Sequence, residues 1–87
     1  MTAEATIHIS SAVVSVLPEW RDRVLNALAA LPGVEVHQRD ASKIVIVMEA
    51  VESGILGGRL AEIASWRGVL SANMVFEHVE QQEDTRS

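Results

Sequence analysis

The sequence predicts an α+β sandwich in which two helices cover one face of a four-stranded antiparallel sheet. Four apolar, β-branched segments and two amphipathic ones follow each other in the order βαββαβ. The two halves resemble each other, since each helix is followed by a Gly-Val pair, Gly33-Val34 and Gly68-Val69. Right-handed crossovers then place both helices on the same side of the sheet, which is the ferredoxin-like arrangement.

The first and third strands are expected at the centre of this sheet. Residues 6–16 are rich in β-branched side chains and contain no glycine or proline. The run from Ile44 to Met48 is apolar without alternation, which indicates that both of its faces are at least partly covered. The second strand, residues 33–40, and the fourth, residues 69–79, alternate more clearly and are expected at the edges.

Each helix is expected to have a buried stripe of apolar residues and a residue that marks where the helix begins. Pro18 is expected to begin the first helix, because a first-turn proline loses no hydrogen bond there. The second helix is expected to open at Glu52-Ser53 with Ser53 as its cap. Gly57-Gly58 inside it indicates either close packing against the sheet, which we expect, or a weak point. The expected stripes are Val24, Leu28 and Leu31 in the first helix, and Leu56, Leu60 and Ile63 in the second.

Length and composition predict one small cytoplasmic domain. The chain has 87 residues, a net charge of −5 and no cysteine, so it has no disulfide framework. Its acidity argues against nucleic acid as a partner. The sequence contains neither a membrane-spanning apolar run nor a basic secretory n-region, so we expect a soluble protein without membrane insertion. We expect disordered residues at 1–5, a folded domain at 6–79, and an acidic disordered tail at 80–87.

The alternation of the strands predicts which side chains lie on the sheet face without helices. In the fourth strand Leu70, Ala72, Met74 and Phe76 are expected to point to the helices, and in the second Arg39 is expected to point away from them. An uncovered apolar patch with a polar rim is typical of a docking surface for a ligand or peptide, or of a homodimer interface. The predicted binding residues are Ser11, Val13, Ser15, Glu35, His37, Val45, Val47, Glu49, Asn73, Val75 and Glu77.

No motif in the sequence indicates catalysis. His8, His37 and His78 fall on three separate strands without metal-ligand spacing. Ser10-Ser11 lacks a nucleophile elbow, and no glycine cluster has the form of a phosphate loop. The sequence therefore predicts a binding module rather than an enzyme, with no cofactor and no metal.

Several segments together resemble the NapD family, the cytoplasmic assembly chaperones of the periplasmic nitrate reductase. The resemblance covers residues 8–83. Ala12 stands where the family often has leucine, and Phe76 where tyrosine is common. The matching segments are His8-Ile9-Ser10-Ser11-Ala12-Val13-Val14, Pro18-Glu19, Leu31-Pro32-Gly33-Val34-Glu35-Val36-His37 with Asp40, Lys43-Ile44-Val45-Ile46-Val47-Met48-Glu49, and Gly68-Val69-Leu70-Ser71-Ala72, followed by the acidic, glutamine-containing tail.

The resemblance implies a chaperone of twin-arginine translocation that takes part in nitrate reductase maturation. Such proteins bind the twin-arginine signal peptide of the catalytic subunit and hold back export until the molybdenum cofactor is inserted. On the predicted face, valines would meet the apolar part of the peptide, and Glu35, Glu49 and Glu77 its arginines. A helix laid across the face and strand addition at the second or fourth strand are both open as poses.

Two rival interpretations share the same order of elements. One is a dimeric ACT-like regulatory module that binds a small molecule, whereas the chaperone interpretation predicts a monomer or weak homodimer. The other is a dimeric monooxygenase-like sandwich, which needs a polar cavity between sheet and helices. The apolar residues predicted to face the helices argue against such a cavity.

Overall fold

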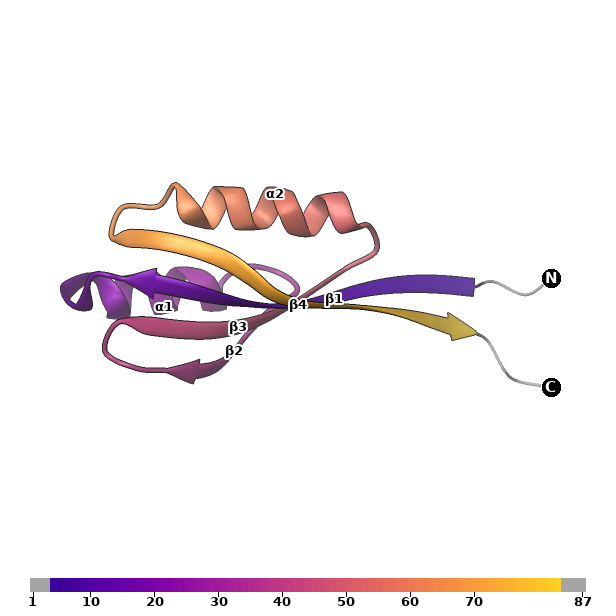
Figure 1. Ribbon diagram of the computed structural model, residues 1–87, viewed down its shortest axis with the longest axis horizontal. Coiled ribbons are helices and arrows are strands. Elements are labelled where there is room, and N and C mark those ends of the chain that lie inside the picture. Colours follow the sequence, from indigo (N-terminus) through magenta and orange to yellow (C-terminus); the bar gives the residue numbers. More distant parts are fainter. Residues whose placement is uncertain (1–3, 84–87) are drawn as a thin grey trace.

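One antiparallel sheet runs through the whole molecule (Figure 1). The computed structural model describes residues 4–83, and the side chains of residues 6–81. Its elements are β1 (Glu4–Val16), a 3₁₀ turn η1 (Pro18–Trp20), α1 (Arg21–Ala29), β2 (Val34–Arg39), β3 (Lys43–Ala50), α2 (Ser53–Ala64) and β4 (Val69–Glu83). The strand order is β2-β3-β1-β4, so β1 and β3 take the centre, as the sequence predicts.

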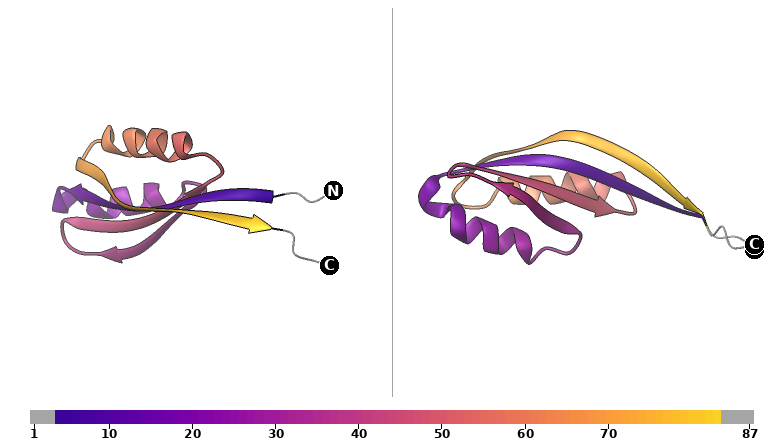
Figure 2. Two further views of the ribbon diagram at one scale, coloured as in Figure 1. Left: turned by 45° about the vertical axis from the view of Figure 1, so that its right-hand side comes forward. Right: turned by 90° about the horizontal axis from the view of Figure 1, so that it is seen from below.

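Both helices pack on the same face of the sheet, as the right-hand view of Figure 2 shows. The predicted stripes of α1 and α2 face this layer, with Leu60 half-buried at its margin. Leu31, predicted as part of the first helix, follows the end of α1 and is half-buried against the same core. One continuous core fills the space between the sheet and the helices. Its members are Ala12, Val14 and Val16 of β1, Ile44, Ile46 and Met48 of β3, Val24, Leu25 and Leu28 of α1, and Leu56 and Ile63 of α2.

The two Gly-Val pairs form matching helix-to-strand turns. Gly33 has a φ of 76° and Gly68 a φ of 89°, a left-handed conformation that favours glycine. The carbonyl oxygen of Gly33 accepts a hydrogen bond from the Glu49 N–H at 2.9 Å, and that of Gly68 accepts one from the Leu17 N–H at 2.9 Å. Each turn therefore ties the end of a helix to a neighbouring segment and sets where the next strand begins.

β1 and β4 form a ribbon that extends past the helices (Figure 1). The backbone register continues to Glu4 opposite Glu83, so the prediction of disorder is wrong for residues 4–5 and 80–83. Backbone hydrogen bonds can pair polar segments without an apolar core, which composition alone does not reveal. The rest of the predicted disorder, at residues 1–3 and 84–87, lies outside the described residues.

Two details of the helices differ from the prediction. Ser53 is the first residue of α2 rather than its cap, and Glu52, at the cap position, makes no side-chain capping bond. A Cβ atom added at Gly57 or Gly58 would meet nothing within 4 Å, so the expected close packing is wrong and the pair faces open space. Within residues 4–83, no helix is both long and apolar enough to cross a membrane.

Candidate peptide-binding face

The two central strands form the middle of the sheet face that carries no helices. Ala12 and Val14 of β1 are buried under the helices, so Ser11, Val13 and Ser15 point to the other side. The register sets Val13 opposite Val45 and Ser11 opposite Val47. These four side chains form the middle of the face, as predicted.

β2 adds an acidic margin and contains a bulge. Glu35 lies opposite Val47 on the open face, and its carboxylate is 3.1 Å from the Nε2 atom of His37. The register shifts between Val36 and Gln38, so that Gln38 rather than His37 lies opposite Val45.

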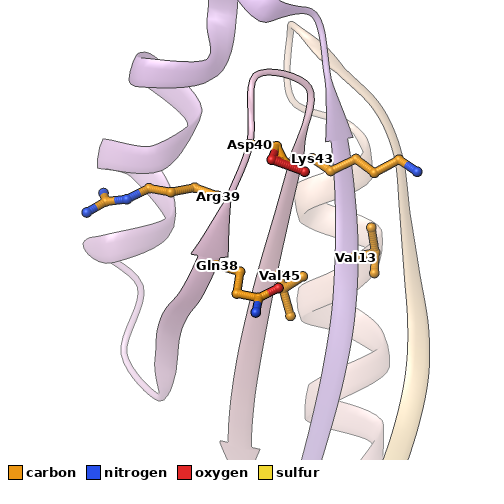
Figure 3. A pocket seen from close by; sticks show the side chains of 6 residues that line it. All are labelled: Val13, Gln38, Arg39, Asp40, Lys43 and Val45. Carbon is orange, nitrogen blue, oxygen red and sulfur yellow. The ribbon is translucent and has the colours of Figure 1, made fainter.

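The same bulge turns Arg39 toward the other side of the sheet. Arg39 lies opposite the buried Ile44, and its guanidinium points away from Val45 in Figure 3. The prediction that Arg39 joins the open face is therefore wrong, because the bulge reverses the alternation after His37.

A second bulge, at Val75, changes the outer half of β4. Asn73 lies opposite Val13 on the open face, as predicted, but the register then shifts so that Phe76 lies opposite Ser11. Val75 and Phe76 therefore share one side of the strand, at exposed fractions of 61% and 59%. The prediction that Phe76 points to the helices is wrong.

Glu77 is displaced from the face by this bulge. It pairs with the fully buried Ser10, and its carboxylate lies 3.8 Å from the Nδ1 atom of His8 on the helix side of the sheet. Of the predicted binding residues, Glu77 alone is thus placed on the wrong face. A one-residue slip moves every later side chain to the opposite face, and local sequence does not mark it.

The first residues of β4 deviate in the same way. Ser71 lies opposite Ser15, whereas Val69 lies opposite Val16, which places Leu70 in a further irregularity. Leu70 was expected under the helices but is 65% exposed, and Val69 packs against the core in its place. Ala72 and Met74 lie on the helix side as predicted, opposite Val14 and Ala12.

Several residues of the face were missed by the sequence analysis. Ile9 lies opposite Glu49 on one side and His78 on the other, and the ring of His78 stacks on Phe76 with centroids 6.4 Å apart. If the regular alternation of β1 is extended toward the N-terminus, it predicts that Ile9 lies on this face. Phe76 and His78 depend on the bulge and could not be found that way.

Two hollows lie on this face beside β2. One, of about 210 Å³, is lined by Glu35, Val47 and Glu49 together with Gly33 and Val34. In the described part of the chain no arginine or lysine pairs with the Glu35 or Glu49 carboxylate. Both carboxylates can therefore accept hydrogen bonds from an incoming cation.

The second hollow lies at the β2–β3 hairpin and measures about 370 Å³ (Figure 3). It is lined by Val13 and Val45 at its floor and by Gln38, Arg39, Asp40 and Lys43 at its margin. In Figure 3 the side chain of Lys43 extends across β1. The face thus combines an apolar middle with an acidic end at Glu35 and Glu49 and a hairpin end at which Lys43 and Asp40 both lie.

The chemistry available on this face is that of binding. Among the described residues, no group of three or more histidine, aspartate or glutamate side chains is placed to hold a metal ion. An apolar strip flanked by exposed carboxylates is complementary to a segment that presents apolar side chains next to arginine or lysine.

Comparison with known proteins finds a family and a relative that match this chain. A family model described as NapD protein matches residues 7–81. A relative named "Chaperone NapD", from Paracoccus pantotrophus, is 40% identical over 73 residues, which cover 84% of this chain and 65% of the relative. The chain therefore spans just under two thirds of that relative's length.

Two solved structures share the fold. The solution structure of the E. coli Tat proofreading chaperone protein NapD matches with a TM-score of 0.75 and 29% identity, over 93% of this chain and 84% of that one. A transcriptional regulatory protein of the AsnC family from Pyrococcus furiosus matches with a TM-score of 0.63 and 22% identity, over 92% of this chain and 52% of that one. At 22% identity this second likeness shows the fold alone.

Proposed function

The chain belongs to the NapD family, and from that premise we propose that it is a chaperone whose open sheet face binds a twin-arginine signal peptide. The proposed partner is the catalytic subunit of the periplasmic nitrate reductase, met in the cytoplasm before export. A bound chaperone would cover the signal peptide and hold back export until cofactor insertion and folding are complete. The relative from Paracoccus pantotrophus and the matching E. coli structure are both named as chaperones.

One observation carries this proposal: a partly exposed apolar strip ends in two carboxylates that pair with no arginine or lysine among the described residues. The strip contains Val13, Val45 and Val47, and the carboxylates are Glu35 and Glu49. A signal peptide has a basic n-region followed by an apolar h-region. Its arginines can form charge-assisted hydrogen bonds with the carboxylates while its apolar segment covers the valines.

Calorimetric titration with a synthetic twin-arginine signal peptide tests the proposal. Binding should be clear with the natural peptide and weaker with a control peptide whose two arginines are replaced by glutamine. Val47→Asp places a charge in the apolar middle and should abolish measurable binding. Lack of binding to either peptide by the folded wild-type protein would contradict the proposal.

A charge-reversal pair separates a local contact from the effect of net charge. Glu49→Lys alters the open face and should weaken binding at least tenfold. Glu62→Lys changes the net charge by the same amount, but Glu62 is exposed on α2, on the opposite side of the sheet. Equal loss in the two variants would show that the carboxylate on the face has no specific part in binding.

The ACT-like alternative predicts an obligate dimer, whereas the chaperone proposal predicts a monomer or weak homodimer. The likeness to the AsnC-family regulator concerns the fold and favours neither function. The size of the protein in solution distinguishes the two.

A further inference from the structure

The charges on the open face are separated along the strand direction. The carboxylates of Glu35, Glu49 and Glu80 lie toward the end where β1 begins, because Glu80 pairs with Ile7 and Glu49 with Ile9. Lys43 lies at the other end, opposite Ser15. The face therefore has an acidic end and a basic end, with the apolar strip between them.

Lys43 shares its end of the face with Asp40, which lines the same hollow. Among the described residues, no carboxylate forms an ion pair with Lys43, whose side chain lies across β1 in Figure 3. Asp40, the nearest acidic residue in the hairpin, contacts Lys43 through the backbone, its N–H donating to the Lys43 carbonyl oxygen at 2.8 Å. A cationic segment placed at this end would meet an unpaired like charge.

The apolar strip is continuous between the two ends. Ile9 and Val13 of β1 lie on it with Val45 and Val47 of β3, and Phe76 of β4 borders it opposite Ser11. From Ile7 to Ser15 the strand is about 26 Å long. A helix of about 17 residues has the same length, enough for a short basic n-region and an h-region of about 7–15 residues.

We propose that the charge separation fixes the direction of the bound peptide, so that it runs along the face in the same direction as β1. The basic n-region then lies over Glu35 and Glu49, and the apolar segment extends past Val13 and Val45 toward Lys43. Lys43 acts as a positioning residue, because it repels the cationic end of a reversed peptide. This inference rests on the proposed function and adds the direction of binding to it.

Paramagnetic labelling tests the direction. The chain has no cysteine, so a single introduced cysteine carries the only nitroxide. Ser53→Cys marks the acidic end, since Ser53 is exposed and begins α2 three residues after Ala50, the last residue of β3. Ala41→Cys marks the basic end in the β2–β3 turn. The peptide carries ¹⁵N at one n-region residue and one residue late in the apolar segment.

Opposite patterns of signal loss are expected from the two labels. The label at residue 53 should remove the n-region signal preferentially, and the label at residue 41 the signal of the apolar segment. The reverse pattern, or equal loss of both signals from both labels, would overturn the inference while leaving the proposed function in place. If titration of the labelled proteins shows no binding, both the inference and the proposed function are wrong.

A charge-exchanged variant tests whether charge sets the direction. The double variant Glu49→Lys/Lys43→Glu keeps the net charge and exchanges the ends. In this double variant, the label at residue 53 should attenuate the apolar-segment signal more, relative to the n-region signal, than it does in the protein with the original charges. The label at residue 41 should likewise attenuate the n-region signal more, relative to the apolar-segment signal. An unchanged ratio in a variant that still binds would show that the charges do not set the direction.

Discussion

At the scale of single residues, the glycines fall into two physical classes. Gly33 and Gly68 have positive φ, and an added Cβ would come within 2.7 Å of the Glu49 carbonyl oxygen and 2.4 Å of the Trp20 Cβ atom, respectively. Gly58 lies inside α2 with open space around it. The sequence marks all three only as glycine, so their different roles depend on the surrounding structure.

A matched pair of alanine substitutions should separate these classes. Gly68→Ala should lower the free energy of unfolding by at least about 1–2 kcal/mol, because a left-handed residue with a Cβ is strained and Trp20 must also move. Gly58→Ala should raise it by up to about 1 kcal/mol, through helix propensity. Urea denaturation measures both changes. Equal effects of the two substitutions would contradict the positions assigned to these glycines.

At the scale of elements, the edge strand β4 carries most of the exposed large apolar side chains. Leu70, Met74, Val75, Phe76 and Val79 are exposed, which makes five of the eight exposed large apolar side chains in the described residues. The bulge at Val75 turns two of them to the open face and sends Glu77 to the opposite side. The bulge thus exchanges a predicted carboxylate for an aromatic ring at the margin of the proposed site.

Two substitutions on β4 test the consequence of this bulge. Phe76→Ser should weaken binding of the signal peptide about tenfold, which corresponds to about 1.5 kcal/mol of lost apolar burial. Met74→Ser should have little effect on affinity, since Met74 lies on the helix side opposite Ala12. Titration calorimetry compares the two. A larger loss with Met74→Ser would indicate that the peptide does not contact Phe76.

At the scale of the whole molecule, the two faces of the sheet have separate tasks. The helix side holds the core, so substitutions there chiefly change stability. The open side carries partly exposed valines and exposed carboxylates that the core does not require. The residues proposed to bind the peptide can therefore be altered while the fold is kept, which makes the proposed function open to direct testing.

The ionic strength dependence of binding tests the electrostatic part of the proposal. Glu35 and Glu49 are exposed, so added salt screens their attraction to the peptide's arginines. The loss of two exposed ion pairs is worth about 1 kcal/mol in total, and Kd should rise about fivefold as NaCl is raised to high concentration. Titration at increasing NaCl measures this effect. The Glu49→Lys variant, as its control, should show a smaller dependence on salt.

The sequence by itself determined the order of the elements, the central place of β1 and β3, the buried stripes of both helices, and most of the open face. These follow from periodicity and branching, because a residue's face is fixed by its distance along a regular strand or helix. Only the tertiary structure decided the faces of Arg39, Leu70, Phe76 and Glu77, and the pairing of residues 80–83. A bulge arises from the fit between two strands distant in sequence, and each extra residue reverses the alternation that follows.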